Sequence, residues 1–372
     1  MTLSVSPHAR LYFRPTGFID APFGFDGQFV RLAGGLQFFS QWHVIAVDAG
    51  VRCGEWLIPI DRIDAVLETL SAAQADAARS VITRVTSQRP SLQLGARVVR
   101  LDQPQVMGIL NMTPDSFSGG SALLDDPEGA AGLAVDLASA GAAIVDIGGE
   151  STRPTATTVW EEDEKKRVLP VLDRLKASGI ALSIDTRKAA VMESALAAGA
   201  NIVNDVSALL YDPRALEIVA AAQCPVVLMH SPGKPDQPHG NDHYSDVLIE
   251  VYDWLEDRIA AVIAAGVPRE RIIADPGIGF GKASLADNLA IINGLSLFHG
   301  LGVPILLGAS RKRLIGALSN EAPTAERLGG SLALALKGAE QGVQLLRVHD
   351  VAETVQALKI WRGLRDRALS AG

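Results

Sequence analysis

One pattern recurs along the chain from about residue 100 onward: a short apolar run ends in polar or glycine residues, and an amphipathic, alanine-rich stretch follows. Strands that alternate with helices form parallel sheets joined by crossovers, and near-continuous apolar strands are typical of a sheet covered on both faces. The pattern occurs eight times, in the runs QVMGILN (105–111), AAIVDIGGE (142–150), ALSIDT (181–186), NIVNDVS (201–207), CPVVLMH (224–230), RIIADPGIGF (271–280), PILLGAS (304–310) and QLLRVHD (344–350).

Eight such units in roughly 270 residues predict an α/β TIM barrel, (β/α)₈, which typically takes about 250 residues. An open doubly wound sheet is the alternative, but that fold would have fewer strands and one glycine-rich first turn. No G-x-G-x-x-G follows any of the runs at a helix start; GIGFGK (277–282) comes nearest and lacks the spacing.

The stretches between the runs carry helix start and stop signals. Asp126 is a suitable N-cap, and Pro127 suits the first helical position. Gly179 and Gly199 each follow a helical stretch, as C-cap glycines do. Apolar positions recur at three- and four-residue spacing, so we expect helices between the strands.

Residues 1–90 lack this alternation. The stretch 17–42 is rich in Gly and Phe, and 61–85 has the periodicity of one amphipathic helix. We therefore expect a small N-terminal α+β appendage over 1–90, whose function the sequence does not indicate, and the (β/α)₈ barrel over 95–370. QRPSLQLG (88–95) is expected to be a linker, and ARVVRL (96–101) a hairpin arm that closes the bottom of the barrel.

Composition narrows the class of protein. With 372 residues and 48% apolar residues, the chain can bury a large core in one domain or two. Its two cysteines, Cys53 and Cys224, form no disulfide framework, which fits a reducing compartment. The first 20 residues lack a signal-peptide run, and no apolar stretch reaches 18 residues. The net charge is −8, without a basic cluster among aromatics. We expect a cytoplasmic protein without a nucleic-acid or membrane partner.

Polar residues stand where the apolar runs end. In a (β/α)₈ barrel the C-terminal ends of the strands converge on one face, where the chemistry takes place. Any single one of these residues could be a turn former or a helix cap, but capping alone does not account for polar groups after all eight strands. The set comprises Asn111, Glu150, Ser151, Thr152, Arg153, Asp185, Thr186, Asn204, Asp205, His230, Asp275, Ser310, Arg311, Lys312, Arg347, His349 and Asp350.

Three loops suggest a phosphorylated substrate. They are GGESTRP (148–154), GASRKRLIG (308–316) and LRVHDVAET (346–354). Anions bind at helix N-termini, and arginine adds bidentate geometry for phosphate oxygens. SRKR alone would be a solvated surface run, but it directly follows an apolar strand, which favours a functional role.

Acidic residues within apolar strands suggest a second half of the ligand. A buried carboxylate such as Asp185 or Asp275 must be paired or protonated, and a ligand with adjacent N–H donors could satisfy it. The alternative is a lysine or a helix N-terminus, which we favour for Asp205 and Asp350. The glycines of DPGIGFGK (275–282) suggest a tight loop near a flat ligand, although the stretch is not a P-loop. His230 lacks zinc-site spacing.

Several motifs together resemble the dihydropteroate synthases over residues 100–365. They occur in family order: GILNMTPDSFS, DIGGESTRP, SIDTRK, NIVNDVS, IIADPGIGFGK, ILLGASRKRLIG and RVHD. The resemblance implies a (β/α)₈ barrel that joins p-aminobenzoate to (7,8-dihydropterin-6-yl)methyl diphosphate and releases pyrophosphate in tetrahydrofolate biosynthesis. It also implies a homodimer and a requirement for Mg²⁺.

The resemblance assigns roles to the matching positions. Asn111 would contact the Mg²⁺ that accompanies the diphosphate. The groups that hold this anion would be Arg153, Arg347 and His349. The aminobenzoate side would be lined by Thr152, Pro154 and Ser310. Hydrogen bonds to the pterin would come from Asp185, Asn204, Asp275 and Lys312, with Met229 and Phe280 near the rings. The catalytic residues would be Arg153, Lys312, Arg347 and His349.

The chain departs from the family pattern in three loops. DSFSGGS (115–121) is one residue shorter than usual, Thr155 stands where glycine is common, and MHSPG (229–233) replaces a Met-His-Met-Gln-Gly type of sequence. Two alternatives stay open. One is a corrinoid-linked methyltransferase, which would need no diphosphate clamp, and the other is a non-catalytic pterin-binding protein that works through its appendage.

Overall fold

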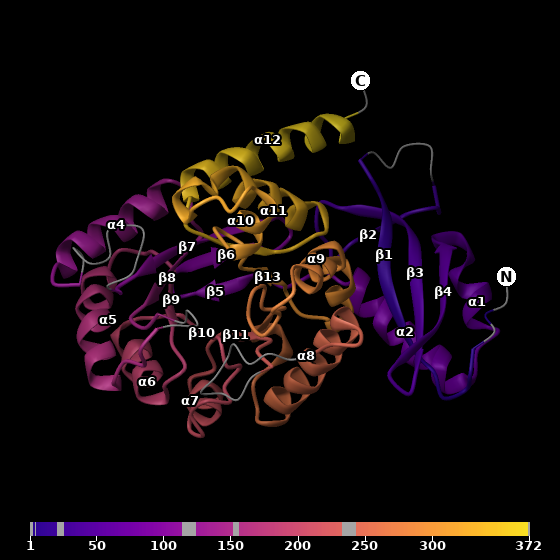
Figure 1. Cartoon of the computed structure of the whole chain (residues 1–372), viewed down its shortest axis with the longest axis horizontal. Coiled ribbons are helices and arrows are strands. Elements are labelled where there is room, and N and C mark those ends of the chain that lie inside the picture. The colour runs from indigo at the N-terminus through magenta and orange to yellow at the C-terminus, as the bar shows by residue number, and fades with distance from the viewer. Residues whose placement is uncertain are drawn as a thin grey trace.

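The computed structural model describes residues 3, 5–20, 26–113, 124–151, 156–232 and 243–370. The larger part of the chain forms an eight-stranded sheet of parallel strands in the order β12-β11-β10-β9-β8-β7-β14-β13 (Figure 1). The strands are β7 (Gln105–Asn111), β8 (Ile144–Gly148), β9 (Leu182–Asp185), β10 (Ile202–Asp205), β11 (Val226–Met229), β12 (Ile272–Asp275), β13 (Leu306–Leu307) and β14 (Leu345–Val348).

The two ends of this sheet meet and close it into a barrel. Ala274 of β12 forms a parallel bridge with Ile305, the residue before β13. The backbone N–H of Ala274 also donates to the carbonyl of Pro304 at 2.9 Å. The expected (β/α)₈ fold is therefore confirmed.

Helices surround the barrel strands. They are α4 (Pro127–Ser139), α5 (Glu161–Leu175), α6 (Ala189–Ala198), α7 (Ala215–Ala222), α8 (Val247–Ala264), α9 (Leu285–Asn293), α10 (Arg313–Leu318), α11 (Leu328–Glu340) and α12 (Val351–Leu369). Three short 3₁₀ helices, η2 (Arg269–Arg271), η3 (Leu295–Leu301) and η4 (Thr324–Glu326), lie in the connections. Among the described helices, none combines the length and the apolar character that crossing a membrane requires.

Helix ends follow the expected caps with one exception. The Asp126 carboxylate accepts a hydrogen bond from the Gly129 N–H at 2.9 Å, which starts α4. Gly199 ends α6 at φ +113°, a conformation that other residues rarely adopt. Helix α5 ends earlier than expected, at Leu175, and Gly179 takes φ +73° in the turn beyond it.

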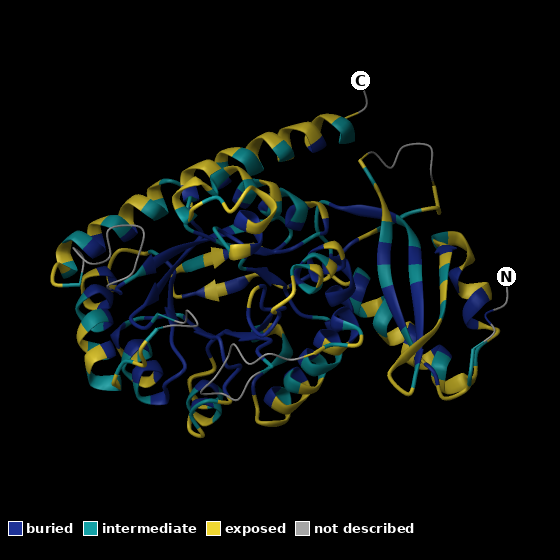
Figure 2. Ribbon diagram, in the orientation of Figure 1, coloured by how far each residue is buried: buried dark blue, intermediate teal, exposed yellow. Residues whose placement is uncertain are grey.

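The barrel strands are buried along their length, and the helices expose only their outer faces (Figure 2). A hairpin of β5 (Leu92–Leu94) and β6 (Arg97–Val99) covers the N-terminal ends of the strands. Leu92, Leu94 and Val99 pack with residues at the strand starts, including Ile144 and Ile202. The expected hairpin arm is thus confirmed, but its first strand lies within the predicted linker 88–95.

The N-terminal unit is an antiparallel sheet with two helices. Its central strand β3 (Phe38–Asp48) pairs with β1 (Arg10–Ile19), β2 (Val30–Arg31) and β4 (Val51–Pro59). The single helix expected over 61–85 is wrong: η1 (Ile60–Arg62) and α1 (Ile63–Leu67) end before α2 (Ala72–Thr86) begins. Ser71 causes this break, because its hydroxyl accepts from the Gln74 N–H and so caps α2.

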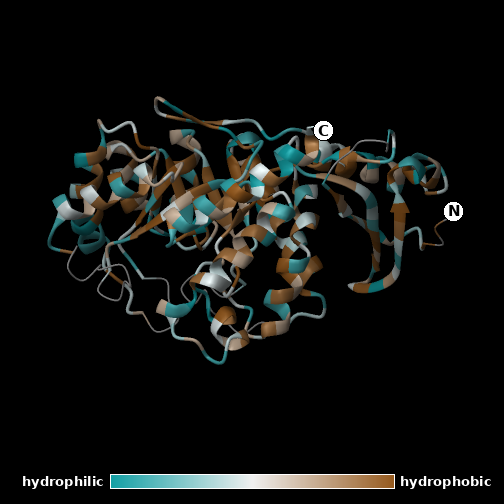
Figure 3. Cartoon of the chain, turned by 90° about the horizontal axis from the view of Figure 1, so that it is seen from above, coloured by the Kyte–Doolittle hydropathy of each residue, from teal (hydrophilic) through white to brown (hydrophobic). Residues whose placement is uncertain are grey.

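This unit stands beside the barrel and packs on α8 and η3 (Figures 1 and 3). Tyr12 on β1 lies edge-on to Tyr252 on α8, with ring centroids 5.6 Å apart. The Tyr12 hydroxyl is 2.8 and 2.9 Å from the two carboxylate oxygens of Asp253. Tyr12, Ile45 and Val47 belong to the same apolar cluster as the barrel helices. These residues of the appendage therefore extend the barrel's core, whereas its other buried apolar residues, including Phe13 and Trp42, form a separate cluster.

Candidate active site

Neighbouring strands place polar side chains side by side at the C-terminal mouth of the barrel. In the parallel register, Asn111 lies beside Gly148, Gly148 beside Asp185, and Asp185 beside Asn204. A Cβ added to Gly148 would lie 3.4 Å from Asn111 Oδ1 and 3.4 Å from Asp185 Cβ. Glycine at this position leaves the space between the flanking side chains open.

Arg347 on β14 lies between two acidic residues. Its Nε donates to Asp146 Oδ2 and its Nη2 to Asp185 Oδ2, both at 2.6 Å. Burial disfavours the charge of Arg347, but Asp146 and Asp185 attract it more strongly, so its pKa lies above the ordinary value. Burial raises the pKa of Asp185 to about 7, although Arg347 opposes this shift. One cation and two carboxylates therefore form a charged triad at the mouth.

Asn204 is tied to the same triad. Its Nδ2 donates to Asp146 Oδ2 at 2.9 Å. An amide that donates with its nitrogen presents its oxygen separately, so the bond orients the Asn204 side chain. Asp146, which is fully buried on β8, thus holds both Arg347 and Asn204.

His349 and Ser310 form a second polar pair. The Ser310 hydroxyl accepts from the His349 backbone N–H at 3.2 Å and lies 3.1 Å from His349 Nδ1. When the hydroxyl donates its proton to Nδ1, Nε2 is the protonated nitrogen of the ring. Burial, helped by Arg347, lowers the pKa of His349 to about 3. His349 is therefore neutral, and in this tautomer it is a hydrogen-bond donor at Nε2.

Asp275 lies on β12, deep in the mouth. Its Oδ1 accepts from the Gly277 N–H at 2.7 Å, and burial raises the pKa of the carboxyl group. A Cβ added to Gly308 would lie 3.7 Å from Oδ2, an ordinary contact distance, so Oδ2 lies close to Gly308 at the end of the next strand. One oxygen is thus fixed by the backbone, and the other lies beside Gly308.

The loop after β12 is as tight as its glycines suggest. Gly277 takes φ +70°, and a Cβ there would lie 2.1 Å from the His230 carbonyl oxygen. Lys282 holds the loop together through its Nζ, which lies 2.8 Å from His230 Nδ1 and donates to the Gly277 and Phe280 carbonyls at 2.9 and 3.0 Å. Burial and Lys282 hold the pKa of His230 well below its ordinary value. His230 is thus a structural acceptor.

Three apolar side chains form a small separate cluster, namely Val206, Met229 and Phe280. The Lys312 ammonium lies 4.4 Å from the centre of the Phe280 ring, as in a cation–π contact. Met229 and Asp275 are neighbours in the strand register. A flat ring bound by Asp275 would therefore meet an apolar surface at its side.

Asp205 and Asp350 are paired within the protein, but their partners are turn amides and an arginine and not the expected lysine or helix N-terminus. Asp205 accepts from the backbone N–H groups of Ser207 and Leu209, at 2.7 and 2.8 Å. Asp350 pairs with Arg311, whose Nε donates to it at 3.0 Å. Arg311 is therefore engaged by Asp350, and of the SRKR run Ser310 and Lys312 are the assigned site residues.

Asn111 was assigned to Mg²⁺, and its surroundings fit a metal held mainly by a substrate. Its amide oxygen faces the open space beside Gly148, and the side chain makes no hydrogen bond to the residues that the structure describes. No group of three or more His, Cys, Asp or Glu side chains suited to a metal occurs within the described ranges. Mg²⁺ commonly takes one or two protein oxygens and completes its shell with phosphate and water.

Part of the expected site lies outside the described residues. This holds for Thr152, Arg153 and Pro154, and also for Thr155, the shortened stretch 115–121 and the last residue, Gly233, of the altered stretch 229–233. The other assigned residues, Asn111, Asp185, Asn204, Met229, Asp275, Phe280, Ser310, Lys312, Arg347 and His349, all lie at or just after the C-terminal ends of barrel strands.

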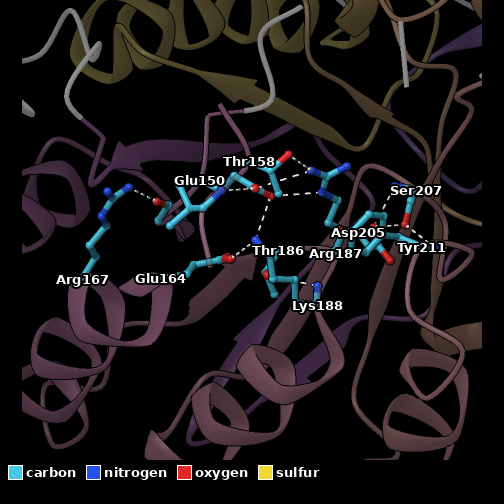
Figure 4. A network of polar contacts seen from close by, with 12 residues as sticks. Glu150, Thr158, Glu164, Arg167, Thr186, Arg187, Lys188, Asp205, Ser207 and Tyr211 are labelled. Carbon is cyan, nitrogen blue, oxygen red and sulfur yellow. Dashed lines mark hydrogen bonds and ion pairs between the residues drawn. The ribbon is translucent and has the colours of Figure 1, made fainter. Parts of the chain in front are cut away.

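The sequence interpretation missed several residues that organise this mouth. Asp146 carries the same signal that singled out Asp185 and Asp275, a carboxylate within an apolar strand, and could have been found. The partners Glu164, Arg187 and Lys188 could not, because Glu164 lies on a helix and the other two follow a strand as ordinary polar residues. They form the network of Figure 4 around Glu150.

Comparison with known proteins agrees with this geometry. A family model described as pterin binding enzyme matches residues 107–349. The barrel and the residues at its mouth thus define a pterin-binding enzyme.

Curated relatives refine the assignment. A dihydropteroate synthase of Neisseria meningitidis serogroup B is 46% identical over 277 residues, which are 73% of this chain and 96% of that protein. The enzyme of Escherichia coli is 44% identical over 264 residues, 70% and 91% of the two chains. Among solved structures, Xanthomonas albilineans dihydropteroate synthase with 4-aminobenzoic acid has 47% identity and a TM-score of 0.69, covering 75% of this chain and 99% of that one. The chain belongs to the dihydropteroate synthase family.

Proposed function

We propose that the chain condenses p-aminobenzoate with (7,8-dihydropterin-6-yl)methyl diphosphate, giving 7,8-dihydropteroate and pyrophosphate in tetrahydrofolate biosynthesis. The observation that carries this proposal is the placement of Arg347 2.6 Å from both Asp146 and Asp185. The arginine proposed to bind the departing diphosphate and the acidic residue proposed to bind the pterin therefore lie at the same mouth of the barrel. Relatives of similar architecture were solved with 4-aminobenzoic acid and, in Burkholderia cenocepacia, with 7,8-dihydropteroate.

The pterin edge suits the acidic groups. A 2-aminopyrimidinone presents neighbouring N–H donors, and an ionised carboxylate accepts through both oxygens. Asp275 has its Oδ2 beside Gly308, and Asp185 and Asn204 stand on adjacent strands of the same rim. Met229 and Phe280 supply the apolar contact beside the ring.

Cleavage of the carbon–oxygen bond builds negative charge on the leaving diphosphate. Arg347 and Lys312 offer fixed positive charge there, and His349 offers a neutral Nε2–H. Donors that are already oriented stabilise such charge without reorganisation during the reaction. Bound Mg²⁺ acts as a Lewis acid on phosphate oxygens, and Asn111 is the residue proposed to contact it. Arg153, with Thr152 and Pro154 on the aminobenzoate side, completes the proposed site.

The attacking amine needs no strong base in this site. An aromatic amine is unprotonated near neutral pH, and its proton can leave after the new bond has formed. Accordingly, the assigned residues orient and neutralise charge, and none of them is assigned as a nucleophile. Ser310 is placed beside the aminobenzoate by the resemblance, and the structure engages its hydroxyl with His349.

The test is an assay of pyrophosphate release by the whole chain. Release should require both substrates and Mg²⁺ and should stop when EDTA is added. Turnover that depends on a corrinoid methyl donor would instead favour the methyltransferase alternative. Binding of the pterin diphosphate without formation of dihydropteroate would favour the non-catalytic one.

Partners and location follow from the same proposal. We expect small-molecule substrates, a homodimer, a cytoplasmic location and no nucleic-acid or membrane partner. Size-exclusion chromatography with light scattering tests the dimer, and a monomeric, fully active chain would contradict it.

A further inference from the structure

One buried carboxylate, Glu150, anchors two points of the chain on either side of residues 152–155. Glu150 directly follows β8 and Gly149, and its side chain is only 4% exposed. Its Oε1 accepts from the backbone N–H of Val159 at 2.9 Å. The segment 151–158 therefore begins and ends at the same side chain, which sets the distance between its two ends.

Arg187 secures this anchor from the next loop. Its Nε donates to Glu150 Oε2 at 3.0 Å, and its Nη2 reaches Glu150 Oε1 at 3.4 Å and Thr158 Oγ1 at 3.5 Å (Figure 4). The guanidinium also lies 4.1 Å from the ring centre of Tyr211. A planar guanidinium can make all of these contacts together, whereas an ammonium cannot.

The network is balanced in charge, and Lys188 links Glu150 to helix α5. Lys188 Nζ lies 3.0 Å from Glu150 Oε2 and also pairs with Glu164 of α5, so two cations meet two carboxylates. Burial opposes ionisation of Glu150, but Arg187 and Lys188 outweigh it and hold its pKa below the ordinary value. Removing one member of a buried pair leaves the other charge uncompensated, so these contacts are strongly coupled.

The same network reaches the pterin side of the mouth. Arg187 and Lys188 are the second and third residues after Asp185. The loop after β8, which carries Thr152 and Pro154, is thus tied to the strand end that carries Asp185. This inference rests on the proposed function, in which these two loops hold different substrates.

We propose that Arg187 is a positioning residue for the p-aminobenzoate half of the site. Acting through Glu150 and Thr158, it holds both ends of the segment that carries Thr152 and Pro154. Arg187 itself need not touch either substrate. The pterin half is held by Asp185, Asn204 and Asp275, whose own contacts do not involve Arg187.

The test compares Arg187→Met with Arg187→Lys and with a matched control, Arg214→Met. Arg214 forms an exposed pair with Glu193 and lies outside the network. For Arg187→Met we expect KM for p-aminobenzoate to rise about tenfold or more, while KM for the pterin diphosphate stays within about twofold. Arg187→Lys should recover part of the loss, and Arg214→Met should behave as wild type. Equal changes in both KM values, or none, would overturn the proposal.

Hydrogen exchange gives a readout that does not depend on turnover. The Val159 amide should be protected in the wild-type chain and lose protection in Arg187→Met; unchanged protection would refute the positioning role. If the wild-type protein releases no pyrophosphate, the proposed function is contradicted, but the hydrogen-exchange measurement still tests the positioning role of Arg187. If Arg187→Met fails to fold, the charge-balanced pair of substitutions Glu150→Gln and Arg187→Met serves in both measurements.

Discussion

Arg347 on β14 donates a hydrogen bond to Asp185 on β9 at 2.6 Å, although β7 and β8 lie between these strands in the sheet. The contact crosses the mouth of the barrel. It joins the arginine proposed for the diphosphate to a carboxylate proposed for the pterin. The two half-sites are therefore electrostatically coupled before any substrate binds.

Replacing Arg347 by alanine should cripple turnover. The change removes the cation at the leaving group and leaves Asp146 and Asp185 without their shared partner. We expect kcat/KM to fall by about 10²–10³ or more, as for the loss of one oriented donor. Steady-state kinetics of pyrophosphate release measure this effect, with Arg347→Lys as the charge-conserving comparison. A near-normal rate for Arg347→Ala would rule out the assigned role.

Pterin binding should weaken as the pH falls below 7. The pKa of Asp185 is raised to about 7, so its ionised form, which accepts the pterin N–H groups, becomes scarcer below that pH. A group that must be ionised costs about tenfold in affinity for each pH unit below its pKa. Fluorescence titration with 6-hydroxymethylpterin from pH 5.5 to 8 measures this. The slope should vanish in Asp185→Asn; a slope that persists there would assign the effect to another group.

His299 should make the fold less stable in acid. It is buried in η3, where burial and Arg89 lower its pKa from 6.5 to about 3, and its Nε2 lies 2.9 Å from the Gln341 carbonyl. Because the unfolded chain binds this proton more tightly, stability is lost as the pH falls from 6.5 toward 3. At pH 5 the protonation of His299 in the unfolded chain lowers the free energy of unfolding by about 2 kcal/mol.

The check is a comparison of urea unfolding for wild type and His299→Gln at pH 7 and pH 5. Glutamine keeps a donor for the Gln341 carbonyl and does not titrate. The variant should lose less stability between the two pH values than wild type does. Identical losses would show that His299 is not the titrating group.

Tyr12, at the interface between the appendage and the barrel, should contribute strongly to the stability of the chain. Replacing a large buried aromatic residue by alanine costs about 3–5 kcal/mol, whereas losing a hydrogen bond to a charged group costs about 1.5–3 kcal/mol. Tyr12→Ala should therefore lower the free energy of unfolding of the whole chain more than Tyr12→Phe, which keeps the packing on Tyr252. Chemical denaturation measures both. A small effect of Tyr12→Ala would mean that the two units unfold independently.

Local signals predicted the barrel well. Asp126 and Gly199 mark helix ends through their own backbone and side-chain chemistry, and the eight apolar runs became eight strands. Local signals failed where one residue interrupts a good periodic pattern. Ser71 splits the helix expected over 61–85, since a serine cap competes with the continuing helix. Hairpin strand β5 was predicted as part of a linker, because three residues are too few to show the alternation of apolar and polar residues that marks a strand.

The sequence by itself determined which residues reach the mouth, because strand ends and their polar followers are set by short-range patterns of apolar and polar residues. Only the tertiary structure decided which of them touch. Closing the sheet through Ala274 and Ile305 brings Arg347 across to Asp185 and Asp146, and packing of successive loops brings Arg187 to Glu150. Such contacts depend on barrel closure and on buried charge finding its opposite, and neither is encoded in the spacing of residues along the chain.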